Sequence, residues 1–423
     1  MKHWIKLDNA AKIYPPIRKK NWSAMFRISA ELTDEVDPEI LEVAQKHILK
    51  RFPSFGCRLE KGFFWYYLER IDGAPPVTKD VYNPMRKLDP DDNNGFMYRL
   101  LYYKKRIAVE FFHVLSDGTG GLTFFLSLLN EYVFLKYGKR GDSSKYILRC
   151  DEAPVPEEYE DSFLKYSPDE SLSRREAPSY HTSGTPAPND KLFIISAKVS
   201  TDQLKEAAKN HNMTLGAFIA ALMLYSVYRK QRAEKSSRKR KKLLKVSVPI
   251  NLRNYFKSTT VRNFSSYVNV GIESKLGEYS FDEICEQVKH QLALHLNKKE
   301  LAARFSANVS AERNIIVRIM PLFLKIIALK IVYMFQGDRY FASQISNLGL
   351  VELPDEIEPY ISRLDLILGR SQELRSDCAV ISFKGNTYLN FSRTTVEADI
   401  EKYFLCDLVK MGVHVYIESN GRD

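Results

Sequence analysis

The fold and the chemistry of this chain are indicated most directly by the stretch HVLSDG, residues 113–118. It ends a run of alternating apolar residues, and a helical pattern rich in leucine and phenylalanine follows it. Because the side chains of a strand alternate between its two faces, Ile107, Val109, Phe111 and His113 share the apolar face. The sequence therefore predicts a desolvated imidazole at the end of a strand, where burial favours the neutral form that a general base requires.

Two interpretations of this stretch are open from the residues alone. In the structural interpretation, His113 is a core histidine that bonds a nearby carbonyl, and Asp117 caps the following helix. In the chemical interpretation, His113 is a base, and Gly118 permits a sharp turn with a close backbone approach. Asp117 follows His113 by four residues around a tight turn, so we expect it to be poorly placed to orient the imidazole as a triad carboxylate does.

The positive charge of the chain is concentrated in one segment. The sequence has 63 lysine and arginine residues against 52 acidic residues, a formal net charge of +11. Residues 229–245 contain ten of these cations and one acid, Glu234, so the remainder carries only about +2. We expect a solvated basic loop here, and the alternative is a contact surface for phosphates, acidic membrane lipid or RNA. Because the charge is so localised, we do not expect a nucleic-acid partner.

The bulk properties indicate a globular protein of more than one unit. A chain of 423 residues favours two domains over a single core. The five cysteines are scattered, odd in number and without Cys-x-x-Cys spacing. This pattern argues against a disulfide framework or a zinc site and favours a reducing compartment. Residues 1–8 show no apolar stretch of a secretory signal, so we expect a cytoplasmic protein without a metal.

The segment over residues 315–335 is strongly apolar and comparable in length to a membrane span. Arg318, Lys325 and Lys330 interrupt it, and Pro321 lies near its start. Three cations within the hydrocarbon would be costly. We therefore expect a mostly buried helix whose lysines point toward solvent, and the alternative is a helix that lies on a membrane surface.

The first part of the chain has an α/β pattern. Residues 25–32 predict a strand, and Asp37-Pro38 predicts the start of an amphipathic helix. An aromatic strand is expected over 63–68 and a hairpin over 98–112, with its turn at Lys104-Lys105. These elements predict one unit that ends near residue 150.

A change of composition separates this part from a second one. Residues 151–190 are rich in Pro, Ser, Glu and Asp and predict a linker or a long surface crossover. Beyond it, the pattern predicts a strand over 192–199, helices between 203 and 228, and a strand over 243–249. The two parts share a coarse order of strands and helices.

Short motifs along the whole chain resemble one enzyme superfamily. The stretch 113–118 matches the defining motif of the chloramphenicol-acetyltransferase-like acyltransferases without departure. Further matches are Trp4-x-x-Leu7-Asp8 with Ala11-Lys12-Ile13-Tyr14-Pro15, Arg51-Phe52-Pro53-Ser54-Phe55 before Phe64-Trp65, Val248-Pro249-Ile250-Asn251-Leu252-Arg253, Arg262-Asn263-Phe264 and Ser346-Asn347-Leu348-Gly349. In this order the chain resembles the alcohol acetyltransferase branch most, with condensation domains of peptide synthetases as more distant relatives. The Asp-Phe-Gly-Trp-Gly element of the plant branch is missing, which argues against that branch and not against the fold.

The resemblance implies an α/β fold of mixed sheets. Two chloramphenicol-acetyltransferase-like subdomains would be related by a pseudo-twofold, with a tunnel between them. Residues 1–150 would form the N-terminal subdomain with the His-x-x-x-Asp-Gly motif, 151–190 the linker, and 191–423 the C-terminal subdomain. Acyl-CoA would enter the tunnel from one face and the acceptor from the other, with His113 midway.

The resemblance also implies an O-acyltransferase that moves an acyl group from acyl-CoA to the hydroxyl of an alcohol or lipid, without a metal. His113 would be the general base and would return its proton to the thiolate. Asp117 would pair with Arg253 and hold the two halves of the site in register. Asn347 and Ser382 are candidates for polar substrate-binding residues near the oxyanion.

Two other functions stay open at this point. A free-standing condensation-type enzyme would take its acyl group from a carrier-protein thioester, and the basic residues 229–245 would contact the acidic carrier or a membrane. A non-catalytic basic protein recruited to membrane or RNA is the third alternative. The intact motif at 113–118 argues against it, because a protein without catalysis has no chemical need for the histidine.

Overall fold

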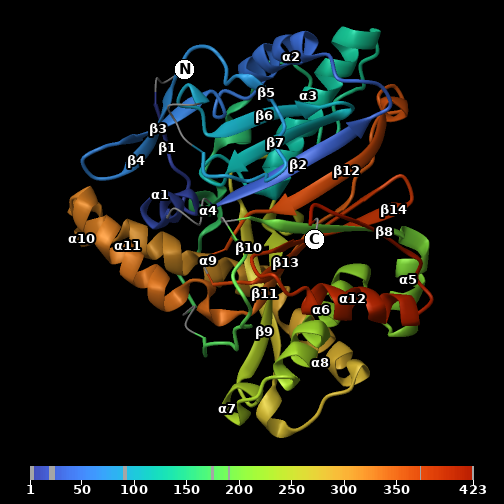
Figure 1. Cartoon of the computed structure of the whole chain (residues 1–423). Helices are drawn as coiled ribbons and strands as arrows, with labels where there is room; N and C mark the ends of the chain where they lie inside the picture. The colour runs from blue at the N-terminus through green and yellow to red at the C-terminus, as the bar shows by residue number, and fades with distance from the viewer. Residues whose placement is uncertain are drawn as a thin grey trace.

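The computed structural model of the chain describes residues 4–18, 24–88, 93–172, 176–188, 191–371 and 373–421. Within these ranges the strands form sheets of three, five and seven strands, with helices packed around the two larger sheets (Figure 1). The five- and seven-stranded sheets each contain both parallel and antiparallel pairs. This is the mixed α/β architecture that the sequence predicts.

The five-stranded sheet carries the motif histidine. Its strands, in the order β12-β2-β7-β6-β5, are β12 (Ile361–Leu368), β2 (Met25–Leu32), β7 (Arg106–Phe112), β6 (Tyr98–Tyr103) and β5 (Val77–Lys79). Helices α2 (Pro38–Arg51) and α3 (Gly118–Tyr137) pack against each other over this sheet (Figure 1). Strand β12 pairs antiparallel with β2 although it comes from the C-terminal part of the chain. The sheet of the N-terminal part is therefore completed by a strand beyond residue 191, and the subdomain boundaries stay a prediction.

The three-stranded sheet lies at one side of this layer. It has the order β1-β4-β3, with β1 (Trp4–Lys6), β3 (Cys57–Lys61) and β4 (Tyr66–Arg70). The strand expected over 63–68 begins later, because Phe63 and Phe64 occupy the turn between β3 and β4 with exposed side chains. That prediction is wrong for the first half of the segment, since aromatic content indicated a strand where the chain makes a hairpin turn.

The seven-stranded sheet belongs to the second part of the chain. Its strands, in spatial order, are β10 (Ser265–Glu273), β9 (Leu243–Asn251), β11 (Ser343–Leu350), β13 (Ser376–Phe383), β14 (Asn386–Arg393), β8 (Phe193–Ser200) and β15 (Val415–Ser419). The helices of this part are α5 (Thr201–Asn210), α6 (Leu215–Arg232), α8 (Phe281–His295) and α12 (Asp399–Lys410). Helix α6 packs on β9 and β11 and contacts both α8 and α12, so it is the central helix of this layer (Figure 1).

The remaining helices connect or flank these layers. They are α1 (Tyr14–Ile17), α4 (Ser162–Tyr166), α7 (Ser237–Arg240), α9 (Lys298–Arg313), α10 (Ile315–Ile319) and α11 (Leu322–Gln336). The basic residues expected as a loop over 229–245 include the end of α6, all of α7 and the start of β9. The crossover expected over 151–190 contains α4 and the buried Glu158, which bonds Arg51 at 2.7 Å. It is therefore packed against the first part of the chain.

Helix starts and ends follow the residues that the sequence shows. Asp37 caps α2 by accepting hydrogen bonds from two backbone amides, and Pro38 occupies the first turn. Ser200 and Thr214 cap α5 and α6 in the same way. Gly138 ends α3 with a φ of 70°, a conformation that glycine adopts without strain.

Two hydrophobic cores lie under the two large sheets. The first includes β2, β6, β7 and helices α2 and α3, together with apolar residues of β12 and Ala379 and Ile381 of β13. The second includes β9, β10 and helices α6, α8 and α12. Strand β12 packs on β13, so the two layers meet along these strands.

Residues 315–335 are the clearest departure from the sequence analysis. They form two helices, α10 and α11, with Pro321 as the N-cap of the second. Many of their large apolar side chains are exposed, whereas Lys325 is 2% exposed. The expectation of a mostly buried helix is therefore wrong, because apolar residues cover both faces of α11. Of its two lysines, Lys330 is exposed as expected, whereas Lys325 is buried. In the part of the chain that the structure describes, no helix combines the length and the apolarity needed to cross a bilayer.

Candidate active site

His113 directly follows β7 and lies in an aromatic enclosure. Its backbone amide donates to the carbonyl of Ala24 at 2.9 Å, which ties the strand end to the start of β2. The imidazole stacks on Tyr14 with ring centroids 5.1 Å apart, and Phe26 lies 4.7 Å away in a tilted arrangement. The ring is half-buried. The two aromatic rings and the strand fix its position before any substrate binds.

The hydrogen bonds of His113 define which ring nitrogen is free to act. Nδ1 lies 3.1 Å from the carbonyl oxygen of Ser116, and a carbonyl can only accept, so Nδ1 carries the proton. The lone pair of the neutral ring is then on Nε2. Burial lowers the pKa of His113 below its usual 6.5, and the Asp117 carboxylate and the Ser116 carbonyl offset this only in part. The neutral ring with a basic Nε2 is thus the form favoured at neutral pH.

Both carboxylate oxygens of Asp117 accept hydrogen bonds from groups other than the imidazole. Oδ1 accepts from the amide of Gly120 at 3.0 Å and so caps α3. Oδ2 accepts from Arg253 Nη1 at 2.9 Å and from the amide of Phe264 at 2.7 Å. The ion pair with Arg253 that the resemblance implies is therefore present, with side chains only 5% and 12% exposed. Asp117 joins the motif turn to the segment after β9.

Arg253 extends this junction through backbone carbonyls. Its Nε donates to Thr260 at 2.8 Å, and Nη2 donates to Arg262 at 2.5 Å. Arg253 and Asp117 stand 136 positions apart in the chain. Because a buried pair of this kind gains little net stability over apolar packing, its contribution is geometric. It holds the motif turn against the second part of the chain.

Gly118 and Gly120 have different roles from those that the sequence indicates. The φ of Gly118 is not in the left-handed region, and a Cβ there would meet only Leu348 Cδ2 at 3.3 Å. A Cβ on Gly120 would lie 1.9 Å from the Val261 carbonyl oxygen and 2.2 Å from Ser116 Oγ. The expectation that the turn itself needs Gly118 is wrong, and the close backbone approach falls two residues later.

We expect Gly120→Ala to destabilise the fold by about 1–3 kcal/mol or more, since the methyl group would overlap backbone that cannot move away. Gly118→Ala is the matched control and should cost little, because the Leu348 side chain can shift. Urea unfolding of both variants checks this. Equal midpoints for the two variants would contradict the placement of the tight contact at Gly120.

The two candidate substrate-binding residues lie on neighbouring strands of the large sheet. Asn347 of β11 is exposed, and its Oδ1 accepts from the amide of Gly349 at 2.8 Å. Ser382 of β13 is 3% exposed, and its hydroxyl lies 2.8 Å from that of Thr387. Leu348, beside Asn347, approaches the motif at Gly118. Asn347 is thus near the motif, while the contact that Ser382 makes is within the sheet, and both roles stay predictions.

Asn263 and Asp8 form a buried layer behind the histidine that the sequence analysis did not assign. Asn263 Nδ2 donates to the carbonyl of His113 at 3.0 Å and to Asp8 Oδ2 at 3.1 Å. Asp8 also accepts from the amide of Ala11 at 2.7 Å and faces Arg262 at 3.5 Å. Burial raises the pKa of Asp8 despite these partners. The layer connects the N-terminal segment, the histidine and the segment after β9.

The aromatic enclosure was also missed, although its residues stand in the quoted motifs. Tyr14 belongs to the stretch Ala11-Lys12-Ile13-Tyr14-Pro15, and Phe26 to the strand over 25–32. Burial, with the charges of Asp8 and Asp117 nearby, raises the pKa of the Tyr14 phenol above its usual range. The phenol is therefore neutral and protonated at any working pH.

Four of the five cysteines are poor candidates for a covalent nucleophile. Burial raises the pKa of Cys57, Cys150 and Cys285 to about 12 and that of Cys378 well above its usual range. A thiol of such pKa is not the thiolate that nucleophilic attack requires. The described residues also contain no cluster of histidine, cysteine and carboxylate side chains suited to a metal. The groups gathered at residues 113–118 fit base catalysis without a covalent acyl-enzyme.

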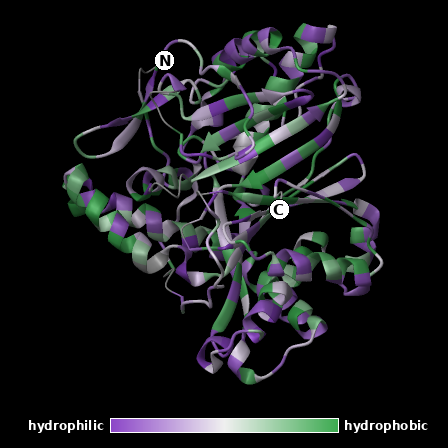
Figure 2. Ribbon diagram, in the orientation of Figure 1, coloured by the Kyte–Doolittle hydropathy of each residue, from purple (hydrophilic) through white to green (hydrophobic). Residues whose placement is uncertain are grey.

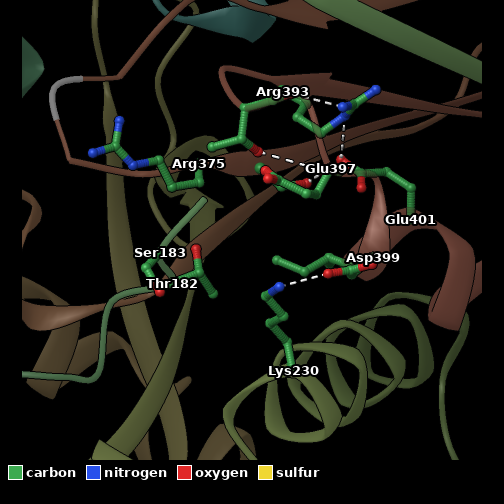
Figure 3. Close-up of a pocket in the computed structure, with 11 residues that line it drawn as sticks. Thr182, Ser183, Lys230, Arg375, Arg393, Glu397, Asp399 and Glu401 are labelled. Atoms are coloured by element: carbon green, nitrogen blue, oxygen red, sulfur yellow. Dashed lines mark hydrogen bonds and ion pairs between the residues drawn. The ribbon is translucent and has the colours of Figure 1, made fainter. Parts of the chain in front are cut away.

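His113 lines neither of two cavities in the structure. The pocket in Figure 3, at the start of α12, has a volume of about 10 Å³, enough for one water molecule at most. Several of its charges pair with one another, as in the contact of Lys230 with Asp399 at 2.5 Å. A second cavity of about 440 Å³ is lined by Arg18, by residues 58–60 of β3, and by residues of the segment 94–97. The pocket at the start of α12, with its volume of about 10 Å³, is therefore too small to hold a substrate.

A family profile described as alcohol acetyltransferase matches residues 159–382, more than half of the chain. The chain belongs to the alcohol acetyltransferase family. It is therefore an acyltransferase, which confirms the enzyme class predicted from the motifs. No curated protein matches the chain in sequence.

Solved structures share the fold of this alcohol acetyltransferase family member. TRI101 of Fusarium graminearum, solved with coenzyme A and T-2 mycotoxin, matches 99% of this chain and 100% of its own, at 12% identity and a TM-score of 0.65. Polyketide synthase associated protein 5 of Mycobacterium tuberculosis matches 95% and 96%, at 14% identity and a TM-score of 0.62. The starter condensation domain of rhizomide synthetase RzmA, solved with C8-CoA and Leu-SNAC, matches 97% and 95%, at 11% identity and a TM-score of 0.61. At these identities the likeness concerns the fold, and it confirms the predicted superfamily architecture.

Proposed function

We propose that this alcohol acetyltransferase family member transfers an acyl group from acyl-CoA to the hydroxyl of an alcohol or lipid, with His113 as the general base. The observation that carries the proposal is the neutral imidazole whose Nδ1 bonds the Ser116 carbonyl, which places the lone pair of the ring on Nε2. The coenzyme A bound to TRI101, a neighbour of the same fold, supports a CoA thioester as the donor.

In the proposed reaction, His113 Nε2 accepts the proton of the acceptor hydroxyl as its oxygen attacks the thioester carbonyl. The new C–O bond forms, and the tetrahedral intermediate collapses by breaking the C–S bond. The imidazolium then gives its proton to the leaving thiolate, so the ring returns to its starting state. The products are an ester and free CoA thiol, and no covalent acyl-enzyme or metal is needed. Asn347 and Ser382 remain the candidate polar contacts to the substrate.

Asp117 and Arg253 act on this reaction through position. Their ion pair ties the motif turn to the segment of Arg262 and Asn263, and Asn263 bonds the His113 carbonyl. An error of about 1 Å in the position of a base can cost about a hundredfold in rate. The junction therefore keeps Nε2 in place relative to a substrate that contacts both parts of the chain.

A carrier-protein thioester is the second candidate donor. The fold shared with the RzmA starter condensation domain favours it, and so do the exposed cations Arg238, Lys241 and Lys242 at and just after α7, since an acidic carrier would complement this surface. The basic residues 229–245 also remain a predicted membrane contact. We do not propose a non-catalytic function in binding membrane or RNA, because the chain belongs to an enzyme family.

The experiment that tests the proposed function is thiol release from a series of acyl-CoAs, with and without a panel of alcohols. We expect release that depends on the alcohol and that selects among acyl chain lengths. Release only from an acylated carrier protein would overturn CoA as the donor. Release with amines and not with alcohols would overturn the hydroxyl acceptor.

The lowered pKa of His113 predicts the acid limb of the pH profile. Because only the neutral ring can accept a proton, kcat/KM should stay level as the pH falls through 6.5 and should decline only at lower pH. The same shift makes protonation favour the unfolded chain, so stability present above pH 6.5 is lost as the pH falls. His113→Gln should lose this part of the acid sensitivity in thermal unfolding. A limb at or above pH 6.5 would contradict a desolvated ring.

A further inference from the structure

Helices α10 and α11 present an apolar surface that no part of the described chain covers. Large hydrophobic side chains on them are between 44% and 72% exposed: Ile315, Ile316, Ile319, Phe323, Leu324, Ile327, Ile331, Val332 and Met334. Both helices project from one side of the molecule, and hydrophobic residues recur along them (Figures 1 and 2). Contiguous exposed apolar surface of this kind marks an interaction site.

The tip of the β3–β4 hairpin extends this surface. Phe63 and Phe64 are 73% and 44% exposed. The carbonyl of Phe63 accepts from the amide of Leu322 at 2.8 Å, and that of Phe64 accepts from Lys325 Nζ at 2.9 Å. Two apolar segments about 260 positions apart in the chain are thus held together. We name this surface, made of Phe63, Phe64, α10 and α11, the apolar platform.

Lys325 holds the parts of the apolar platform together through specific contacts. Its ammonium group lies 3.9 Å from the centroid of the Trp65 ring and donates to the carbonyls of Phe64 and Arg318. Burial lowers the pKa of this lysine. A buried cation with these partners fastens the hairpin tip to both helices, and the exposed apolar side chains remain outside.

The charges of the platform restrict what can cover it. Arg318 and Lys330 are exposed among the apolar side chains, and residues 314–336 contain no acidic residue. A second copy related by a twofold would bring cations against cations without an acid to pair with them. A bilayer with anionic headgroups fits both the cations and the apolar side chains of the platform. The cations bind the headgroups, and the apolar side chains enter the boundary between headgroups and acyl chains.

The dimensions also fit a surface helix. Helix α11 has 15 residues and is about 22 Å long, whereas the hydrocarbon core is about 30 Å thick. Its inner face packs on α1, whose first residue, Tyr14, stacks on His113. We infer that the apolar platform docks this enzyme on anionic phospholipid bilayers, with α10 and α11 lying in the interface. This inference rests on the proposed function only for its consequence, which is that the bilayer would lie on the side of His113 where α1 and Tyr14 stand.

The test is co-sedimentation with vesicles of phosphatidylcholine and phosphatidylserine, without acyl-CoA, so that its outcome is separate from that of the proposed function. We expect the wild type to bind and the double variant Phe323→Ser/Ile327→Ser to bind at least about tenfold more weakly. Leu276→Ser/Leu294→Ser is the matched control, because these leucines are equally exposed elsewhere and should leave binding unchanged. Arg318→Glu/Lys330→Glu should weaken binding to the mixed vesicles more than to phosphatidylcholine alone.

Three results would overturn the inference. The first is a wild type that does not bind the mixed vesicles. The second is binding that survives Phe323→Ser/Ile327→Ser but is lost when Arg238–Lys242 are neutralised, which would place the contact at the basic residues 229–245. The third is a wild-type dimer in light scattering that the platform variant converts to a monomer, which would identify a second copy as the partner.

Discussion

His113→Ala should yield a folded protein whose kcat/KM for CoA release is lower by about 10²–10⁴-fold. The loss is expected because the variant has no group at the end of β7 that can take the proton of the attacking hydroxyl. The structural cost should be about 1 kcal/mol, since the ring is half-buried and its polar partners include a carbonyl oxygen that an exchanged water can satisfy. Thiol release and urea unfolding of the same preparation measure both quantities.

The control for this variant is His211→Ala. His211 is also half-buried, stacks on Phe218 and bonds Asp282 at 2.8 Å, but it is the C-cap of α5 and its contacts are with α6 and α8. Its removal should leave the rate unchanged. A folded His113→Ala protein with wild-type activity would remove His113 from the mechanism, and the structural interpretation of the histidine would then hold.

Asp117→Ala should cost about 3–5 kcal/mol of stability, so that little soluble protein is obtained. The substitution leaves the Arg253 guanidinium buried without its carboxylate and removes the acceptor of the Gly120 and Phe264 amides. An unpaired buried charge is the most costly of these losses. Soluble yield and urea unfolding provide the measurement.

Asp117→Asn separates charge from hydrogen bonding at the same site. It keeps a cap acceptor for the Gly120 amide and should be intermediate in stability. A triad carboxylate would behave differently, because its loss would lower the rate in a protein of normal stability. A stable, soluble Asp117→Ala protein that is only slower would therefore contradict the role of Asp117 as the junction between the two parts of the chain.

Much of the local structure was predictable because it rests on local signals. The strand over 25–32 and the hairpin over 98–112 follow from alternation and from the turn at Lys104, whose φ is 50°. The helix begun by Asp37-Pro38 follows from its cap and proline. In contrast, the pairing of β12 with β2 joins residues more than 300 positions apart, and no local pattern reports such a contact.

The apolar helices show the limit of composition as a guide. Residues 315–335 were expected to be buried because they are apolar, and hydropathy does not distinguish a core helix from one that faces outward. Helix α3, whose sequence is also rich in leucine and phenylalanine, gives the opposite case, because Leu122, Phe124 and Leu128 are all fully buried. Phe124 packs on the rings of Phe52, Phe55 and Phe111, and the backbone of residues 141–148 bonds Asn130 and Ser127. Only the tertiary arrangement decides which helix is enclosed.

The part of the candidate site that lies in one short sequence motif, together with its partner, could be predicted from the sequence. His113, Asp117 and the partner Arg253 follow from the motif and from the resemblance. Tyr14 and Asn263 were present in quoted stretches but had no assigned role, since their contacts with His113 span 99 and 150 positions. Aromatic stacking and a hydrogen bond to a backbone carbonyl do not require a fixed separation of the two residues along the sequence. The contacts of these two residues with His113 are therefore identified only from the structure.

The central claim is that His113 activates an acceptor hydroxyl for direct attack on a CoA thioester. The most direct measurement follows ester and free thiol together, by mass spectrometry of the alcohol and a colour reaction for the thiol, as acyl-CoA is consumed. The account predicts equal amounts of the two products in the wild type, no thiol without alcohol, and neither product above background in His113→Ala. Thiol release without ester, or an acylated protein that accumulates when alcohol is withheld, would contradict it.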